Sequence, residues 1–393
     1  MKLTIFRSKE APILYGHPWI FPKAIKDDPQ NLPAGSWVTV YSESGEWLGS
    51  GVYNPHSLYR VRILQRKDAL FSLETTIEYH LRKALALRTT LLLPNALTNA
   101  YRLLNSEADG LSGLTIDRFN NTLVIAPSAY WAMEHKDLIL HCIKKVLPLI
   151  AMEQAIEQIV WHPQNKALVQ DGWSSPEEPK KEPFSPTQVL ENGIAFHVDF
   201  NQMQKTGLYL DQRENHELIG ALAQGKNVLD LYTYTGGFAL HAAKGGAISI
   251  TAVDSSKEAI SIAKQNAELN HYSNIEFLTG DAREYLTQAG KYDLVILDPP
   301  KLIPSQKHLS QAKNYYRFLH REIFRTMKED SLLLTCNCSY ALSTQDFLNL
   351  ISEQAFLEKR TIQLLGIYGP SRCHPILPSF PEGQYLTALL LAL

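Results

Sequence analysis

The sequence predicts an α/β protein with an open, mostly parallel sheet in its C-terminal half, preceded by a small β barrel and a mixed α+β segment. Two observations predict the sheet. Apolar runs alternate with helical patterns between about residues 227 and 335, as in successive βαβ units. Several of these runs end in an aspartate or another polar residue, at the sheet edge where open α/β sheets bind ligands. A third observation predicts the barrel: the first 66 residues contain short β-branched and aromatic runs separated by Gly, Pro and Asn.

The strongest single motif is the segment Asn227–Gly237, in which an apolar strand reaches Asp230 and a turn of small residues leads into a helix from Phe238. Glycines allow a ligand to approach the backbone, and a helix N-terminus offers N–H groups to a carboxylate or phosphate. The spacing is not a dinucleotide fingerprint, and Asp230 would repel a pyrophosphate. An acid here suits a ligand with an amine, and S-adenosylmethionine (SAM) has both an amine and a carboxylate. A tight bend without a ligand is the structural alternative.

Further acids follow the neighbouring strands. Asp254 ends the second strand, roughly 20–25 residues after Asp230, where an acid binds ribose hydroxyls in this architecture. Asp281 follows the third strand and is placed to meet an adenine amino group. Asp298 ends the fourth strand, and the fifth runs into Cys336–Ser339. One such acid is most often a solvated strand end, but the series predicts a nucleoside-type site.

These motifs resemble those of class I SAM-dependent methyltransferases. The wider pattern resembles the large-subunit ribosomal RNA methyltransferase I family, which makes 5-methylcytosine in 23S RNA. The resemblance implies SAM as the cofactor, RNA as the partner and a Rossmann-like methyltransferase domain of seven strands with the last one antiparallel. The segments that carry it span most of the chain: Glu107–Arg118, Gln204–Arg213, Tyr234–Phe238, Leu297–Lys301, Asn337–Ser339 and His374–Leu386.

We expect three domains: a PUA-like RNA-binding domain at 1–68, an α+β linker domain at 69–200 and the methyltransferase domain at 201–393. His17–Phe21 and Gly49–Pro55 resemble the start and core of a PUA domain. The first 66 residues hold eight Lys and Arg against five Asp and Glu, a local charge of 8 − 5 = +3 that favours RNA contact. A purely structural accessory domain is the alternative.

The linker should contain a helix from Ala69 to Leu93 that Pro94 stops, a hairpin over Arg102–Pro127, a helix near 136–147, a strand near 155–161 and a second hairpin over 187–200. Its expected role is structural, as a spacer and a wall of the RNA cleft.

The resemblance also implies which residues bind SAM. The segment just before the sheet would cover the cofactor, with Arg213 on the methionine carboxylate because a guanidinium binds carboxylates with two prongs. A surface ion pair at a helix start is the alternative for Arg213. The complete predicted set is Thr206, Gly207, Asp211, Arg213, Asp230, Tyr232, Thr235, Gly236, Gly237, Phe238, Asp254, Asp281, Ala282 and Asp298.

Methylation of carbon 5 of cytosine needs a nucleophile that first adds to carbon 6, and a cysteine suits this task. In the resembled family the catalytic cysteine precedes a serine, which matches Cys338, while Asp298 would hold N3 or the exocyclic amine. Cys336 would share a face with Cys338 if the strand persists, and core packing is its expected role. Many RNA 5-methylcytosine enzymes carry a second cysteine where this chain has Pro300 and Lys301, so the base for the final proton is unassigned.

The predicted substrate contacts are Pro299, Pro300, Lys301 and His374. For His374, anchoring of its own loop is an equal alternative. RNA, expected to be 23S rRNA, must bind a local surface because the formal net charge is −2. The four cysteines have no metal-ligand spacing, so no metal is expected.

No secretory signal or membrane-spanning run is apparent, which leads us to expect a cytoplasmic protein. A homodimer is left open. Two other functions also stay open: an amino-group methyltransferase on nucleic acid, and a non-catalytic SAM- and RNA-binding protein of ribosome assembly.

Overall fold

The computed structural model describes residues 1–29, 31–67, 71–149, 155–174, 183–201, 208–302 and 309–393. The chain forms two compact units, and each unit collects segments that are distant in sequence. The first unit comprises Met1–Thr187, Asp199–Gly207 and Cys373–Gly383, and the second comprises Gln188–Val198, Leu208–Arg372 and Gln384–Leu393. The finer domain bounds at residues 68 and 200 stay a prediction.

The N-terminal part of the first unit is a five-stranded sheet with the order β1-β3-β4-β5-β2. Strand β1 lies parallel to β3, and the other pairs are antiparallel. Alternate side chains along the strands, such as those of Val38 and Val40, point into one apolar core. The small β domain expected from the sequence is therefore confirmed. Its elements are β1 (Lys2–Ile5), α1 (Glu10–Leu14), β2 (Trp19–Ile20), β3 (Ser36–Ser42), β4 (Trp47–Tyr53) and β5 (Val61–Gln65).

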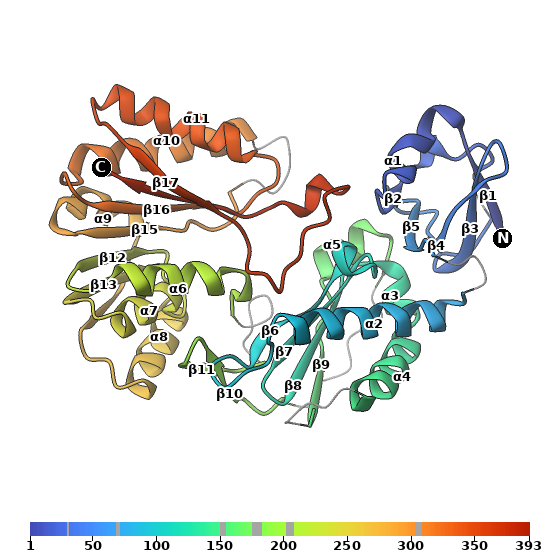
Figure 1. Ribbon diagram of the computed structural model, residues 1–393, viewed down its shortest axis with the longest axis horizontal. Coiled ribbons are helices and arrows are strands. Elements are labelled where there is room, and N and C mark those ends of the chain that lie inside the picture. The colour runs from blue at the N-terminus through green and yellow to red at the C-terminus, as the bar shows by residue number, and fades with distance from the viewer. Residues whose placement is uncertain (30, 68–70, 150–154, 175–182, 202–207, 303–308) are drawn as a thin grey trace. The chain divides into compact units, whose positions relative to one another are not determined.

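The rest of the first unit is a four-stranded sheet with the order β6-β7-β8-β9, and α2 and α4 lie beside it (Figure 1). The first three strands are antiparallel, and β9 is parallel to β8. The apolar face of α2, which includes Ile77, Leu81 and Leu85, is buried in the core. The elements are α2 (Leu73–Thr90), β6 (Ala100–Asn105), β7 (Leu114–Phe119), β8 (Thr122–Pro127), α3 (Tyr130–Glu134), α4 (Lys136–Val146), β9 (Gln158–Trp161) and α5 (Asn165–Gln170).

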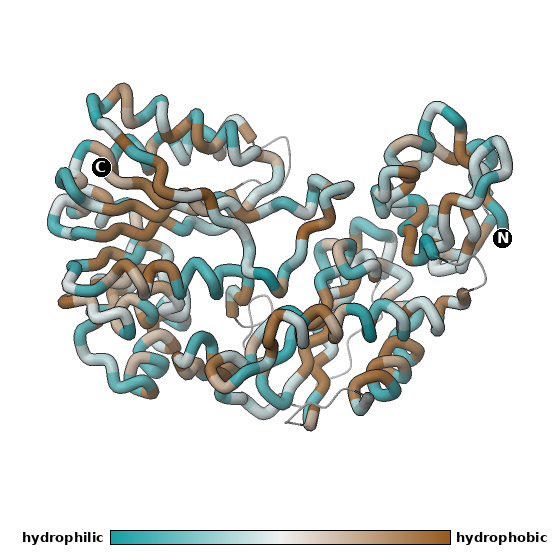
Figure 2. The backbone as a smooth tube through the Cα atoms, viewed as in Figure 1, coloured by the Kyte–Doolittle hydropathy of each residue, from teal (hydrophilic) through white to brown (hydrophobic). Residues whose placement is uncertain are grey.

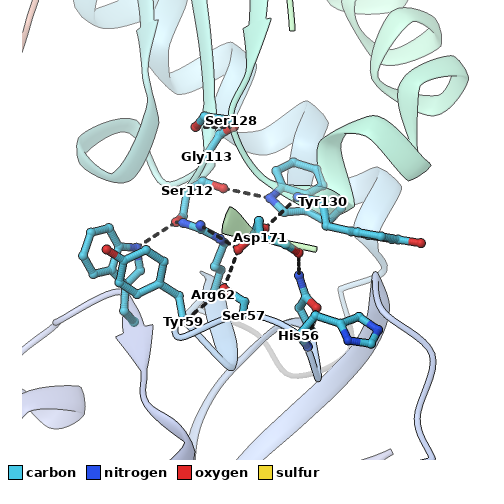
Figure 3. Close-up of polar contacts among 12 residues, drawn as sticks. His56, Ser57, Tyr59, Arg62, Ser112, Gly113, Ser128, Tyr130 and Asp171 are labelled. Atoms are coloured by element: carbon cyan, nitrogen blue, oxygen red, sulfur yellow. Dashed lines mark hydrogen bonds and ion pairs between the residues drawn. The ribbon is translucent and has the colours of Figure 1, made fainter. Parts of the chain in front are cut away.

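A buried polar network within the first unit joins its two sheets, and Asp171 is its centre (Figure 3). Asp171 Oδ1 accepts hydrogen bonds from the Ser57 hydroxyl and from Arg62 Nη2, the latter at 3.4 Å. Its Oδ2 accepts from the Tyr130 N–H at 2.7 Å, and its carbonyl oxygen accepts from Asn54 Nδ2 at 2.7 Å. Asp171 is 4% exposed, so these donors replace the water that its buried carboxylate has lost.

The other end of the Arg62 guanidinium reaches the segment Glu107–Arg118 (Figure 3). Arg62 Nη1 donates to Ser112 Oγ at 3.0 Å and lies 3.6 Å from Glu107 Oε1. Trp19 Nε1 also donates to Ser112 Oγ, at 3.1 Å. The segment was one of those that carried the family resemblance, and these contacts give it a structural role in holding the first unit together.

The second unit is built on a seven-stranded sheet with the order β14-β13-β12-β15-β16-β18-β17. Only β18 runs antiparallel to its neighbours, as expected for the last strand. The central strands are almost wholly hydrophobic (Figure 2), as in sheets covered on both faces. The strands are β12 (Asn227–Leu231), β13 (Ser249–Asp254), β14 (Ile275–Thr279), β15 (Leu294–Leu297), β16 (Leu332–Asn337), β17 (Gln363–Tyr368) and β18 (Thr387–Ala392).

Helices cover both faces of this sheet: α10 and α11 lie on one side, and α6, α7 and α8 on the other (Figure 1). The hairpin β10–β11 contacts α7 and α8. No helix among the described residues is long and apolar enough to span a bilayer. The elements are β10 (Thr187–Glu191), β11 (Ile194–Val198), α6 (Arg213–Leu222), α7 (Gly237–Lys244), α8 (Lys257–Leu269), α9 (Ala282–Tyr285), α10 (Leu309–Thr326) and α11 (Thr344–Leu357).

We predict that Asp171→Ala destabilises the protein by about 3 kcal/mol or more, because removing one partner of a buried ion pair leaves the other charge uncompensated. Arg62 would keep its hydrogen bond to Ser112, but among the described residues the more distant Glu107 would be its remaining acidic partner. Urea unfolding followed by circular dichroism measures the loss. The exposed Asp137 on α4 provides the control, since Asp137→Ala should change stability by less than about 0.5 kcal/mol. Equal effects of the two substitutions would contradict the role of the network.

Candidate active site

The predicted functional groups gather where the strand order of the seven-stranded sheet reverses. Strands β12 and β15 are neighbours there, and Leu231 is paired with Leu297. On the flanking strands, Val253 pairs with Leu231 and Thr335 pairs with Leu297. The residues that follow these positions therefore leave the sheet at one edge, which is the ligand-binding edge of open α/β sheets.

Asp298 and Cys338 meet at this edge. The Cys338 thiol donates to Asp298 Oδ1 at 3.7 Å, and Gln212 Nε2 donates to Asp298 Oδ2 at 2.9 Å. The pKa of Asp298 is raised to about 6. Burial is the largest cause and the nearby charge of Asp211 the second, while the Gln212 hydrogen bond lowers the pKa. The carboxyl group can therefore gain or lose a proton close to neutral pH.

Cys336 differs from Cys338 although only one residue separates them. Cys336 lies within β16, paired with Ala388 of β18, and is fully buried. Burial raises the pKa of its thiol well above the usual range. Strand β16 ends at Asn337, so Cys338 lies beyond it and is half-buried. These surroundings fit the packing role expected for Cys336 and leave Cys338 as the accessible thiol.

Asp230 is fully buried at the end of β12. Its Oδ2 accepts from Thr233 Oγ1 at 2.5 Å and from the Ala239 N–H at 3.1 Å. Its Oδ1 has no hydrogen-bond partner among the described residues. Burial raises the pKa of Asp230 to about 7, and the Thr233 hydrogen bond opposes this. A buried oxygen without a donor is a position where a ligand amine would fit.

Three residues of the turn after β12 have left-handed backbone conformations: Tyr232 with φ 68°, Tyr234 with φ 52° and Gly236 with φ 91°. Such conformations cost energy in residues other than glycine and often mark functional sites. The Asp254 carboxylate secures the turn by accepting from the Tyr234 N–H at 2.9 Å and from the Ser256 N–H at 2.9 Å. Asp254 thus links the ends of β12 and β13.

Gly237 is required by packing rather than by turn geometry. A Cβ built on it would lie 2.6 Å from ring atoms of His216, and the ring of Phe238 meets the same imidazole edge-on at 4.4 Å. His216 in turn is held by Glu191 of β10, through a 2.7 Å hydrogen bond to its Nδ1. The missing Cβ of Gly237 leaves room for the His216 ring, and the Phe238 ring packs against that ring behind the turn. Direct contact of Gly237 or Phe238 with a cofactor stays a prediction.

Glu191, His216 and His241 form a buried cluster in which the candidate metal-ligand atoms lie within 4.8 Å of one another. Burial opposes the charge of Glu191, but the charge of His216 and its hydrogen bond outweigh burial and lower the pKa of the carboxyl. Burial lowers the pKa of His241 to about 4. We read the cluster as a hydrogen-bonded pair with a neutral neighbour, because Glu191 and His216 already satisfy each other directly.

The remaining predicted cofactor residues have varied surroundings. Arg213 is 5% exposed, and its Nη1 has no hydrogen-bond partner among the described residues, which would suit a ligand carboxylate. Asp211 Oδ2 accepts from the Tyr385 hydroxyl at 2.8 Å.

Both oxygens of Asp281 accept from the Arg283 side chain, so the Asp281 carboxylate is engaged within the chain. The Tyr232 and Tyr315 hydroxyls lie 3.1 Å apart.

The other predicted positions are less closely associated with this edge. Thr235 is buried, and its carbonyl oxygen accepts from Asn266 Nδ2 at 3.1 Å. Ala282 is buried behind Asp281. Thr206 and Gly207 lie outside the described residues.

The predicted substrate contacts fall into two groups. Pro299 is buried next to Asp298, whereas Pro300 and Lys301 are exposed beyond it. His374 belongs to the first unit, is 4% exposed and has its Nδ1 3.4 Å from Cys373 Sγ. A contact of His374 with substrate stays a prediction.

Sequence reasoning missed Gln212 and Tyr209. Gln212 lies inside the segment Gln204–Arg213 but carries no charge that would have drawn attention to it. The Tyr209 ring is 37% exposed and meets the Tyr234 ring edge-on at 5.1 Å. Partial burial raises the pKa of its hydroxyl, and the negative charges of Asp298 and, more weakly, Asp211 raise it further. An exposed aromatic residue just before a cofactor turn was the available signal for Tyr209.

Comparisons with known proteins agree with this geometry. Residues 150–362 match the family described as S-adenosylmethionine-dependent methyltransferase, and residues 3–66 match the PUA-like domain. A solved Streptococcus mutans protein, assigned as a SAM-dependent methyltransferase, has a TM-score of 0.80 and 23% identity and covers 100% of both chains. SMU.776, assigned as a methyltransferase and solved with S-adenosylhomocysteine, has a TM-score of 0.81 and 24% identity and also covers 100% of both chains. These two likenesses confirm the fold.

Sequence relatives extend the match to the whole chain. The ribosomal RNA large subunit methyltransferase I of Alteromonas mediterranea is 33% identical over 98% of this chain and 96% of its own length. The protein of the same name from Photobacterium profundum is 34% identical over 98% of this chain and 97% of its own. The chain therefore belongs to the ribosomal RNA large subunit methyltransferase I family of SAM-dependent methyltransferases.

Proposed function

We propose that this protein methylates carbon 5 of a cytosine in 23S ribosomal RNA. The observation that carries the proposal is the contact between the Cys338 thiol and Asp298 Oδ1, at 3.7 Å, at the ends of adjacent strands β15 and β16. This pair supplies the nucleophile and the acid–base group that the reaction needs. The names of the full-length relatives support ribosomal RNA as the substrate.

Several residues would hold SAM at the same edge. Asp230 Oδ1 would accept from the ligand amine, Arg213 Nη1 would pair with its carboxylate, and Asp254 would bind ribose hydroxyls. When bound, SAM supplies an electrophilic methyl group. The buried Asp230 would accept the cationic amine more readily in its ionised form, and the positive charge of that amine favours this form.

The chain's own residues then activate the base. As the sulfur of Cys338 bonds to carbon 6 of cytosine, the thiol proton moves to Asp298 Oδ1. The electron pair of the carbon 5–carbon 6 bond shifts towards N3, which takes the proton from Asp298. Carbon 5 thereby becomes the electron-rich carbon of an enamine. Carbon 5 accepts the methyl group as the methyl–sulfonium bond breaks. Its own proton then leaves to water, the C–H electron pair restores the ring double bond and expels the Cys338 thiolate, and N3 returns its proton through Asp298 to that thiolate.

The same geometry weighs against an amino-group methyltransferase. Such an enzyme needs no nucleophilic thiol, yet here an accessible cysteine contacts the carboxyl that would bind the base edge. An exposed lysine, Lys301, follows the two prolines in place of an aromatic residue that would stack on the target. Mass analysis of nucleosides from RNA methylated by the purified enzyme tests the proposal: 5-methylcytidine is expected, and N-methylated nucleosides alone would refute it.

We predict that Asp254→Ala weakens SAM binding about tenfold to a hundredfold, because a charge-assisted hydrogen bond to the ligand is lost. The Tyr234 N–H would also lose its acceptor, so the turn would loosen. Titration calorimetry with SAM measures the effect. Glu276→Ala, at an exposed acid on neighbouring strand β14, should leave the affinity unchanged. Wild-type affinity in the Asp254→Ala protein would remove Asp254 from the cofactor site.

We predict that Cys338→Ala abolishes methyl transfer while SAM binding persists, because the thiol acts on the base and not on the cofactor. Cys336→Ala, the matched control two residues earlier and within β16, should retain methyl transfer with some loss of stability. RNA with 5-fluorocytidine at the target should trap the wild-type enzyme covalently, because the fluorine cannot leave as a cation. Peptide mapping that located the cross-link on Cys336, or an active Cys338→Ala enzyme, would overturn the assignment.

We predict that residues 1 to about 66 contribute RNA affinity through exposed basic side chains such as Lys9 and Lys23. Deleting the whole segment would remove the side-chain donors to Asp171 (Asn54, Ser57 and Arg62), so the double substitution Lys9→Ala and Lys23→Ala is the cleaner test. RNA affinity should fall, and the slope of log K against log salt should decrease in size by about 0.7 to 0.9 for each lost phosphate contact. Lys264→Ala, on α8, is the control, and indistinguishable slopes would make the segment purely structural.

A further inference from the structure

We propose that Gln212 is a positioning residue that fixes which oxygen of Asp298 takes part in proton transfer. This inference rests on the proposed function, because it concerns the carboxyl that relays the proton from Cys338 to the base. Gln212 is 2% exposed and lies in the short 3₁₀ turn just before α6. Its Nε2 donates to the Asp298 carboxyl, so its effect on the reaction would pass through Asp298.

The orientation of the Gln212 amide follows from a chain of hydrogen bonds that begins at the backbone. The carbonyl oxygen of Gly369 can only accept, and Asn215 Nδ2 donates to it at 3.3 Å. The same Asn215 nitrogen donates to Gln212 Oε1 at 2.5 Å. The oxygen end of the Gln212 amide therefore faces Asn215, and the nitrogen end must face Asp298.

This orientation makes the two oxygens of Asp298 unequal. Gln212 Nε2 can only donate, so Asp298 Oδ2, 2.9 Å away, must accept. A proton on Oδ2 would point at an N–H group and find no acceptor there. A proton on Asp298 is therefore placed on Oδ1, the oxygen that faces Cys338 Sγ at 3.7 Å. Without Gln212 the proton could occupy either oxygen, and half of the protonated forms would face away from the thiol.

The ionisation of Asp298 is also sensitive to Gln212. The donated hydrogen bond favours the carboxylate, so losing it should move the titration to higher pH. The relay begins with the carboxylate, and activity should therefore fall as the pH drops through the Asp298 pKa, which burial raises to about 6. Other titratable groups around Asp298 interact with its charge. They are Tyr209, Asp211, His216, Asp230, Tyr316, Cys336 and Cys338.

The test compares Gln212→Leu with the wild-type enzyme in the pH profile of kcat/KM for RNA methylation, which reports groups of the free enzyme. The acid limb should move to higher pH by about one unit or more, because the hydrogen bond that favours the Asp298 carboxylate is lost. The kcat should fall roughly tenfold, as part of the general acid–base contribution is lost. The KM for RNA and the SAM affinity should change less than about threefold, because a positioning residue contacts neither ligand.

Two further variants control the experiment. Asn215→Leu keeps Gln212 but frees its amide to turn over, so the acid limb should shift in the same direction by a smaller amount. Gln345→Leu replaces an exposed glutamine on α11 and should reproduce the wild-type profile. SAM titration establishes that each variant is folded. If Gln212→Leu fails this check, the profile of Asn215→Leu decides the question.

A second readout needs no RNA. The rate at which iodoacetamide alkylates Cys338, followed by mass analysis of its peptide, should show a step where Asp298 titrates, because the carboxylate charge disfavours the thiolate beside it. In Gln212→Leu this step in the alkylation rate should lie at higher pH. A shifted step in an enzyme that makes no 5-methylcytosine would refute the proposed function and leave the role of Gln212 intact. A folded Gln212→Leu protein with both the step and the acid limb at their wild-type positions would overturn this inference.

Discussion

The site depends on carboxylates at the edge of a hydrophobic sheet, each of which accepts hydrogen bonds from the segments around it. Asp230 takes a hydroxyl and an N–H from the turn and helix that follow it. Asp254 takes two backbone N–H groups and thereby ties two strand ends together. Asp298 takes an amide and a thiol. A buried charge without hydrogen-bond donors is costly. The hydrogen bonds to these carboxylates therefore also hold the donating segments in place.

The first unit applies the same constraint to a structural task. Asp171 and Arg62 sit between two sheets, and the hydrogen bonds around them order the segment Glu107–Arg118. Buried Arg88 extends the pattern, since it binds both oxygens of Asp109 and donates to the carbonyl oxygen of Cys373 at 2.8 Å. A segment that lies between β17 and β18 in sequence, Cys373–Gly383, is thereby built into the first unit.

Apolar periodicity allowed many strands and the helices α2, α4, α7 and α8 to be predicted, because it reports directly which faces are buried. The antiparallel last strand was implied by the family resemblance, and α6, α10 and α11 were not predicted. The sequence also indicated Asp230, Asp254, Asp298 and Cys338, since charged or reactive groups at strand ends stand out. Gln212 and His216 were missed because their importance arises only from tertiary contacts: an uncharged amide and a packed imidazole carry no local pattern. That Cys373–Gly383 belongs to the first unit, although the sequence on both sides of it belongs to the second, was missed for the same reason.

The two cysteines show most clearly what a linear pattern leaves undecided. An alternating strand would have placed Cys336 and Cys338 on one face, with similar surroundings. The strand instead ends at Asn337, whose Nδ2 donates to the carbonyl oxygens of Ser339 and Leu342, at 3.1 and 3.0 Å, and so folds the chain back. That turn leaves Cys336 in the core, where burial suppresses its thiolate, and moves Cys338 to the rim beside Asp298. The different exposure of the two thiols is therefore decided by where strand β16 stops, one residue before Cys338.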